Sequence, residues 1–127
     1  MSLKTPLGRV LGLGAAGGGS HHWWLQRLTS LALVPLSIWF VVSLLCLPGL
    51  DHATVVAWMS QGLTAVLLIL FVLTATWHSR LGVQVVIEDY VHGGARTLLL
   101  VLSGFGHVFL AVAGVFAILQ VALGRSA

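Results

Sequence analysis

The sequence predicts an all-α membrane protein with three transmembrane helices, its N-terminus in the cytoplasm and its C-terminus in the periplasm. Of its 127 residues, 58% are hydrophobic and only 7% are charged, whereas about a quarter of the residues of a soluble domain are usually charged. Three stretches lack Asp, Glu, Lys and Arg, and each exceeds the roughly 20 residues that a helix needs to cross the hydrocarbon. They lie between Arg27 and Asp51, between Asp51 and Arg80, and between Arg96 and Arg125. Strands are excluded, because an open sheet would leave backbone groups unpaired in lipid.

The first helix is expected at about residues 24–47, with Trp23 and Trp24 at the headgroup interface. Pro35 lies inside this span and is expected to bend the helix without ending it, because neighbouring groups can satisfy the freed backbone carbonyl. The Pro-Gly pair within residues 47–52 indicates a tight turn after it.

The second and third helices are expected at about residues 54–82 and 97–123, and Gly93-Gly94 interrupts the chain between them. The Gly-rich residues 1–20 are expected to form a flexible cytoplasmic tail, which leaves residues 21–127 as a single three-helix membrane domain.

The positive charges predict the orientation, because short cytoplasmic loops carry the excess of Lys and Arg. Arg125 stands alone on one side of the predicted bundle. The basic residues on the other side are Lys4, Arg9, Arg27, Arg80 and Arg96. The N-terminus and the second loop are therefore expected inside.

Several function classes are excluded. The net charge of +3 is modest and no run of Lys and Arg occurs, so a nucleic-acid partner is not expected. Cys46 is the one cysteine, and it can neither form an internal disulfide nor hold an iron–sulfur cluster, which needs several thiolates. The nucleotide-binding, zinc-protease and hydrolase motifs are absent as well.

His78 is the first candidate functional residue, because a titratable ring at membrane depth costs free energy. It can ligate haem iron, since His is a usual axial ligand, and Gly82 and Thr74, one turn away on either side, leave a flat surface beside it. Alternatively, it hydrogen-bonds a backbone carbonyl across a helix interface.

Asp89 and Tyr90 follow His78 at the expected inner boundary of the membrane. If the helix continues, Asp89 lies roughly under His78, about 16 Å along the axis. A phenol there can donate a hydrogen bond to a quinone carbonyl while the carboxylate relays a proton. Alternatively, Tyr90 is an interfacial anchor with an acidic neighbour.

Two further residues have open interpretations. Arg27 can pair with a haem propionate or a phosphate, or it can snorkel to lipid headgroups. His107 is expected at a depth similar to that of His78 on a neighbouring helix. It is therefore a second haem ligand within this chain, a packing residue, or a hydrogen-bond donor to a residue of the site.

Two motifs resemble those of the smaller hydrophobic membrane anchor of succinate dehydrogenase, respiratory complex II. They are His78-x3-Gly82-x6-Asp89-Tyr90 and His22-Trp23-Trp24-Leu25-Gln26-Arg27-Leu28-Thr29-Ser30. The second is similar to the alphaproteobacterial and mitochondrial-like branch. The resemblance covers about residues 20–124, and the two motifs together are more specific than either alone.

The resemblance implies a protein of electron transport and the tricarboxylic acid cycle, and it implies a role for each candidate residue. His78 would be an axial ligand of a haem b shared with the other membrane anchor, the cytochrome b anchor. Arg27 would lie near the haem propionates, and Tyr90 with Asp89 would bind ubiquinone. FAD and the iron–sulfur clusters would belong to the flavoprotein and iron–sulfur subunits. The protein would be a multi-pass component of the bacterial inner (cytoplasmic) membrane, or of the mitochondrial inner membrane in a eukaryote, in contact with lipids.

Two alternatives remain beside this hypothesis. The equivalent anchor of a fumarate reductase would serve the reverse reaction with a low-potential quinol. A non-redox membrane scaffold or a component of a small transporter would use His78 only as a polar contact between helices.

Overall fold

The computed structural model describes residues 16–124, and this part of the chain forms four helices. They are α2 (Ala16–Leu45), α3 (His52–Met59), α4 (Gly62–Tyr90) and α5 (Gly94–Ala122). Three stretches are long and apolar enough to cross a membrane, namely Ser20–Leu45, Gly62–Tyr90 and Gly94–Ala122. The predicted all-α class, with three helices able to span a membrane, is therefore confirmed, whereas the direction of the termini stays a prediction.

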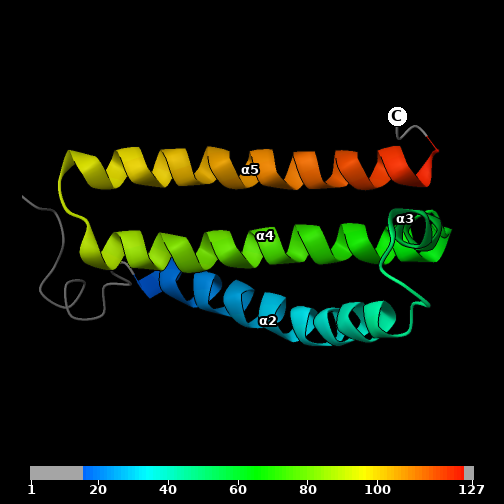
Figure 1. Ribbon diagram of the computed structural model, residues 1–127. Helices are drawn as coiled ribbons and strands as arrows, with labels where there is room; N and C mark the ends of the chain where they lie inside the picture. Colours follow the sequence, from blue (N-terminus) through cyan, green and yellow to red (C-terminus); the bar gives the residue numbers. More distant parts are fainter. Residues whose placement is uncertain (1–15, 125–127) are drawn as a thin grey trace, which may run out of the picture.

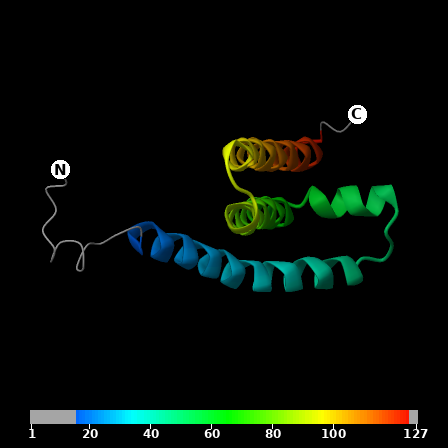
Figure 2. The same cartoon turned by 90° about the vertical axis from the view of Figure 1, so that its left-hand side faces the viewer.

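Helix α4 is the centre of the bundle. It packs against α2 and against α5, which lie on different sides of it, as Figure 1 shows. The short helix α3 runs across one end of the bundle and contacts α4 and α5 (Figure 2). In keeping with this arrangement, α4 contributes the buried residues Thr64, Ala65, Leu68, Leu81 and Ile87, whereas α5 contributes Ile118.

The apolar core lies at the α3 end of the bundle. Its buried members are Trp58 from α3, Ala65 and Leu68 from α4, and Ile118 from α5. Trp39 of α2 stacks on Trp58 with ring centroids 6.1 Å apart. Aromatic rings bury a large apolar area, so this cluster fixes how the short helix joins the three long ones.

The prediction of one helix over residues 54–82 is wrong, because the chain breaks between α3 and α4. Gln61 has extended backbone angles (φ −69°, ψ 127°), and the hydroxyl of Ser60 donates to the carbonyl of Val56 at 2.8 Å. The triplet Ser60-Gln61-Gly62 is a turn signal. The prediction missed it because the span was drawn from the absence of charged residues, and this turn carries no charge. At the start of α3, Asp51 accepts hydrogen bonds from the hydroxyl and amide of Thr54, which hold the pKa of this carboxyl below its usual value.

Helix α4 also continues past residue 82 and ends at Tyr90. The predicted end was too early because it followed the apolar pattern alone. With 29 residues, α4 is about 43 Å long, which exceeds the roughly 30 Å of the hydrocarbon. Its last turns therefore extend into the interface, where charged residues are tolerated. Asp89 and Tyr90 thus belong to the same helix as His78.

The start of α2 differs as much as the end of α4, whereas the end of α2 and both ends of α5 lie within three residues of the prediction. Helix α2 begins at Ala16, ahead of the predicted residue 24, because extending a formed helix adds one hydrogen bond per residue. Only residues 16–20 of the predicted tail 1–20 are described, and they belong to α2. Pro35 lies within α2 and does not end it. Gly93 precedes α5 with a φ of 68°, a conformation that glycine adopts without strain.

Candidate functional site

His78 lies half-buried at the interface between α4 and α2. Its Nδ1 is 2.9 Å from the hydroxyl of Thr29, and its Nε2 is 3.3 Å from the side-chain nitrogen of Gln26. Thr29 and Gln26 stand three positions apart on α2 and so share one face of that helix. The ring is therefore held between two polar side chains of a single neighbouring helix.

Two buried polar atoms of α2 lack a hydrogen-bond partner. They are Oε1 of Gln26, whose amide nitrogen lies against His78, and Nε2 of His22, four positions before Gln26 on the same helix. A Cβ added to Gly82 would lie 3.8 Å from the side-chain nitrogen of Gln26, so this glycine faces the same contact. An unmet buried polar group costs about 1–3 kcal/mol, so these atoms indicate that a polar group from outside the chain completes the site.

Asp89 and Tyr90 lie exposed at the end of α4, and Tyr90 is 80% exposed. Because α4 is continuous from His78 to Asp89, the two residues are about three turns apart on roughly the same side of the helix. The preceding Glu88 accepts a hydrogen bond from Gln84 at 2.9 Å. The Tyr90 ring is thus open to contact with another molecule.

Arg27 is exposed on α2, one residue after Gln26. Its guanidinium carbon lies 4.8 Å from the centroid of the Trp23 ring, a cation–π contact. Trp23 and Trp24 pack edge to face, with centroids 5.1 Å apart. The charge is therefore held at the interface by aromatic rings and stays open to an anionic group.

His107 does not join His78. Its Nδ1 lies 2.7 Å from the carbonyl oxygen of Ser103, one turn earlier on α5, and its Nε2 lies 3.2 Å from the hydroxyl of Ser79 on α4. His78 is directed at α2, whereas His107 links α5 to α4. The two imidazoles, which the sequence left open as a pair, have different partners on different helices.

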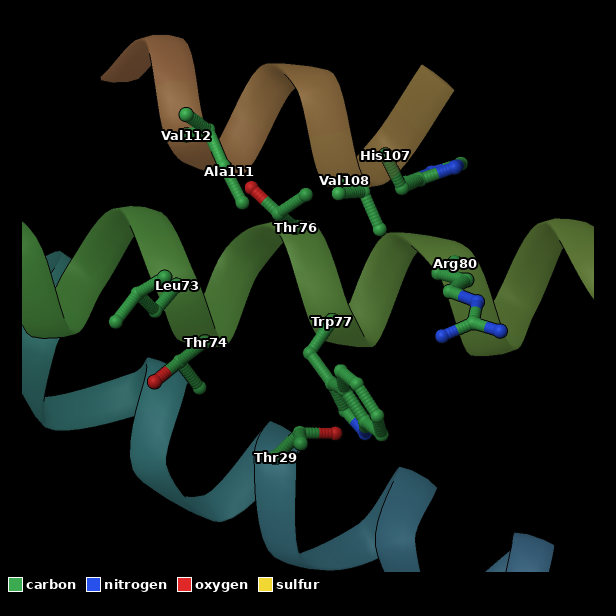
Figure 3. Close-up of a pocket in the computed structure, with 10 residues that line it drawn as sticks. All are labelled: Thr29, Leu73, Thr74, Thr76, Trp77, Arg80, His107, Val108, Ala111 and Val112. Atoms are coloured by element: carbon green, nitrogen blue, oxygen red, sulfur yellow. The ribbon is translucent and has the colours of Figure 1, made fainter. Parts of the chain in front are cut away.

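A groove of about 470 Å³ runs along α4 between α2 and α5 (Figure 3). Trp77 extends from α4 toward Thr29, and Arg80 lies 5.4 Å from the Trp77 ring centroid. The groove is lined by Thr29, Leu73, Thr74, Thr76, Trp77, Arg80, His107, Val108, Ala111 and Val112. Its size is that of a small-molecule site, mostly apolar with a few polar groups.

Sequence reasoning missed the roles of Gln26 and Thr29 at His78 and of Arg80 in the groove. From the sequence, Arg80 only marked the end of a charge-free stretch and contributed to the predicted orientation. A weak signal for the first two was present, because Gln26 and Thr29 are polar residues spaced by three and so share one face of the first helix. Which residue of α4 they meet depends on how the helices pack, and this is not visible in the sequence.

The donor set suits some cofactors and not others. Residues 16–124 contain no group of three or more His, Cys, Asp or Glu side chains that could hold a metal ion. A haem needs only axial ligands from the protein, and His78 with its unpaired polar neighbours can supply one of them. His78 could therefore serve as one such ligand, provided that the side chain of Gln26 turns away from its Nε2.

The fold and site together define a multi-pass membrane protein with a candidate cofactor site between two helices. Comparison with known proteins agrees, since residues 1–118 match the family model described as the succinate dehydrogenase/fumarate reductase transmembrane subunit. The chain belongs to this family.

The chain is also similar to individual proteins that are named as succinate dehydrogenase membrane anchors. The succinate dehydrogenase hydrophobic membrane anchor subunit of Paracoccus denitrificans is 31% identical over 125 residues, which cover 98% of this chain and 96% of that protein. The protein of the same name from Rickettsia conorii is 32% identical over 105 residues, covering 80% and 83% of the two chains. That of Rickettsia bellii is 38% identical over 78 residues, covering 61% of this chain and 62% of the relative.

Proposed function

We propose that this chain is the membrane anchor of a succinate dehydrogenase that passes electrons to ubiquinone. It would form a complex with a cytochrome b anchor, an iron–sulfur subunit and a flavoprotein subunit in a bacterial inner membrane, or in the mitochondrial inner membrane of a eukaryote. The names of its relatives support the enzyme. The single cysteine supports a division of labour in which FAD and the iron–sulfur clusters belong to other subunits.

One observation carries the proposed cofactor site, namely the polar contacts of His78. The imidazole lies against Thr29 and Gln26, and Oε1 of Gln26 is buried without a partner. We infer that His78 is one axial ligand of a haem b, that the cytochrome b anchor supplies the other, and that Arg27 pairs with a propionate. The side chain of Gln26 has to turn away from Nε2 for a metal to bind there. A bound haem supplies a one-electron redox centre.

The quinone site is proposed at the inner end of α4. The Tyr90 phenol is exposed and can donate a hydrogen bond to a ubiquinone carbonyl. Asp89 precedes it and can hold or relay a proton for the reduced ring. Because α4 carries His78 as well, one rigid helix would fix the haem ligand and the quinone residues relative to each other.

The haem ligand is tested by His78→Ala in the assembled complex. We expect the dithionite-reduced haem b band to fall about tenfold or more, because even the loss of a ligand's hydrogen-bond partner typically lowers metal affinity 10–100-fold. The measurement is the optical spectrum with and without dithionite.

His107→Ala is the matched control, because His107 is a second half-buried imidazole in contact with α4. It should keep the band. Loss of the band in both variants would instead support a haem held by both imidazoles of this chain. An unchanged spectrum and midpoint potential in His78→Ala would contradict ligation by His78.

A fumarate reductase anchor is the second candidate, because the matching family model covers both enzymes. Measurements of the haem midpoint potential and of the native quinone distinguish the two, since fumarate reduction needs a low-potential quinol. A non-redox scaffold would show no haem spectrum at all.

A further inference from the structure

The hydroxyl of Thr29 donates its proton to backbone carbonyls of its own helix. Its oxygen lies 2.8 Å from the carbonyl oxygen of Leu25 and 3.0 Å from that of Gln26. A carbonyl oxygen can only accept, and a hydroxyl has a single proton. The proton of Thr29 therefore points back at its own helix, as is common for threonine in membrane helices.

The hydrogen bond between Thr29 and His78 can therefore run in one direction only, with His78 as the donor. Because the Thr29 proton is committed, its oxygen meets Nδ1 of His78 at 2.9 Å with a lone pair. Nδ1 must then donate, which places the ring proton on Nδ1. The other nitrogen agrees, because Nε2 faces the amide nitrogen of Gln26 at 3.3 Å, and an amide nitrogen donates but does not accept.

We propose that Thr29 is the positioning residue that fixes His78 in the Nδ1–H tautomer and so directs the Nε2 lone pair at the haem iron. This inference rests on the proposed function. Ligand histidines usually donate their second ring N–H to a fixed acceptor, which sets the tautomer and raises the basicity of the ligand. Thr29 would act through His78 and would not touch the iron itself.

The tautomer is measurable without haem. The full-length chain, labelled with [15N]histidine and reconstituted in lipid bilayers, gives distinct signals for protonated and unprotonated ring nitrogens, and His78→Gln identifies the signal of His78. We expect Nδ1–H in the wild type. A wild-type His78 protonated on Nε2 would overturn the proposal whatever any variant does.

Two variants of Thr29 separate the hydroxyl from the shape of the side chain. Thr29→Val keeps the branched shape and removes the oxygen, so it should release the tautomer. In the assembled complex it should weaken haem binding about tenfold, at the lower end of the usual range for such partners, and raise the haem midpoint potential. Haem affinity is measured by transfer to a haem-scavenging globin. Thr29→Ser keeps the oxygen and should behave like the wild type.

Ser79→Ala is the matched control, because it removes a hydroxyl that contacts a different imidazole, that of His107, at 3.2 Å. It should leave the potential and the His78 tautomer unchanged. If His78→Ala removes the haem but Thr29→Val changes neither the tautomer nor the potential, the role of Thr29 is refuted and the proposed function stands. If His78→Ala leaves the haem intact, the assignment of His78 as a haem ligand fails, and the role of Thr29 toward the iron fails with it. The tautomer measurement then shows only how Thr29 orients the ring.

Discussion

At the scale of single residues, neighbours decide what an imidazole can do. Both ring nitrogens of His107 are satisfied by protein groups, the carbonyl of Ser103 and the hydroxyl of Ser79. His78 has Thr29 on one nitrogen, but the amide beside its other nitrogen leaves its own oxygen buried without a partner. Buried polar groups are usually paired, so the surroundings of His78 favour an additional ligand and those of His107 do not.

Tyr90 gives a prediction at this scale. Tyr90→Phe keeps the interfacial ring and removes only the hydroxyl, so quinone reduction should slow by up to about tenfold, the value of one hydrogen bond of roughly 1.4 kcal/mol. The rate from succinate to quinone is compared with the rate from succinate to a water-soluble artificial acceptor, which should not change.

The exposed neighbour His92 offers the control for Tyr90. His92→Gln alters a side chain two residues further on, to which no role is assigned. It should reduce quinone at the wild-type rate. Equal quinone rates in Tyr90→Phe and the wild type would refute the role of the phenol.

At the scale of elements, α4 and α5 approach each other closely at Gly114. A Cβ added there would lie 2.8 Å from Cγ1 of Val72, closer than real contacts allow. Valine has one strongly preferred rotamer in a helix, so Val72 cannot easily turn aside. In a membrane, where lipid is as apolar as the side chains, close packing at small residues holds helices together.

Gly114→Ala should therefore destabilise the pairing of α4 with α5. Overpacking costs about 1–3 kcal/mol, and the better helix propensity of alanine returns about 1 kcal/mol, so the net loss is up to about 2 kcal/mol. Thermal unfolding in detergent measures it, and Val72→Ala should restore stability in the double variant.

Gly106 on the same helix is the control for Gly114, because a Cβ there meets nothing within 4 Å. Gly106→Ala should leave stability unchanged or raise it slightly. If both substitutions behave alike, the close contact at Gly114 does not matter for the pairing.

At the scale of the whole molecule, packing is uneven. The core cluster lies at the α3 end, whereas the end that carries His78 and Tyr90 has few buried side chains. Exposed large apolar residues recur every three or four positions along α5, namely Leu98, Leu102, Phe105, Phe109, Val112 and Phe116. Such an open bundle suits a protein that lipid and the other members of a complex cover.

The orientation of the bundle is a prediction for the whole chain. Three spans place the two ends of the chain on opposite sides of the membrane, and the basic residues predict the C-terminus outside. A tag at the C-terminus should therefore be digested when protease is added to spheroplasts, while a cytoplasmic marker protein stays intact. A tag that is protected until the membrane is opened would overturn the orientation.

The sequence predicted the membrane-spanning stretches better than the exact boundaries of the helices. Charge-free stretches located all three long helices, because lipid excludes charge wherever the helices pack. The break at Ser60–Gln61 and the continuation of α4 to Tyr90 were missed. Local sequence preferences are weak at both places. Apolar packing around Trp58 decides the first, and the polar environment beyond the hydrocarbon decides the second.

By itself, the sequence determined that this protein is a helical membrane protein and that His78, Asp89 and Tyr90 are its unusual residues. Composition decides this, because burying charge in lipid is costly and each polar residue in a span stands out. Only the tertiary structure decided that His78 meets Thr29 and Gln26, and that His107 meets Ser79 and Ser103. Those partners come from helix faces brought together by packing, and a hydrogen bond depends on positions within a few tenths of an ångström.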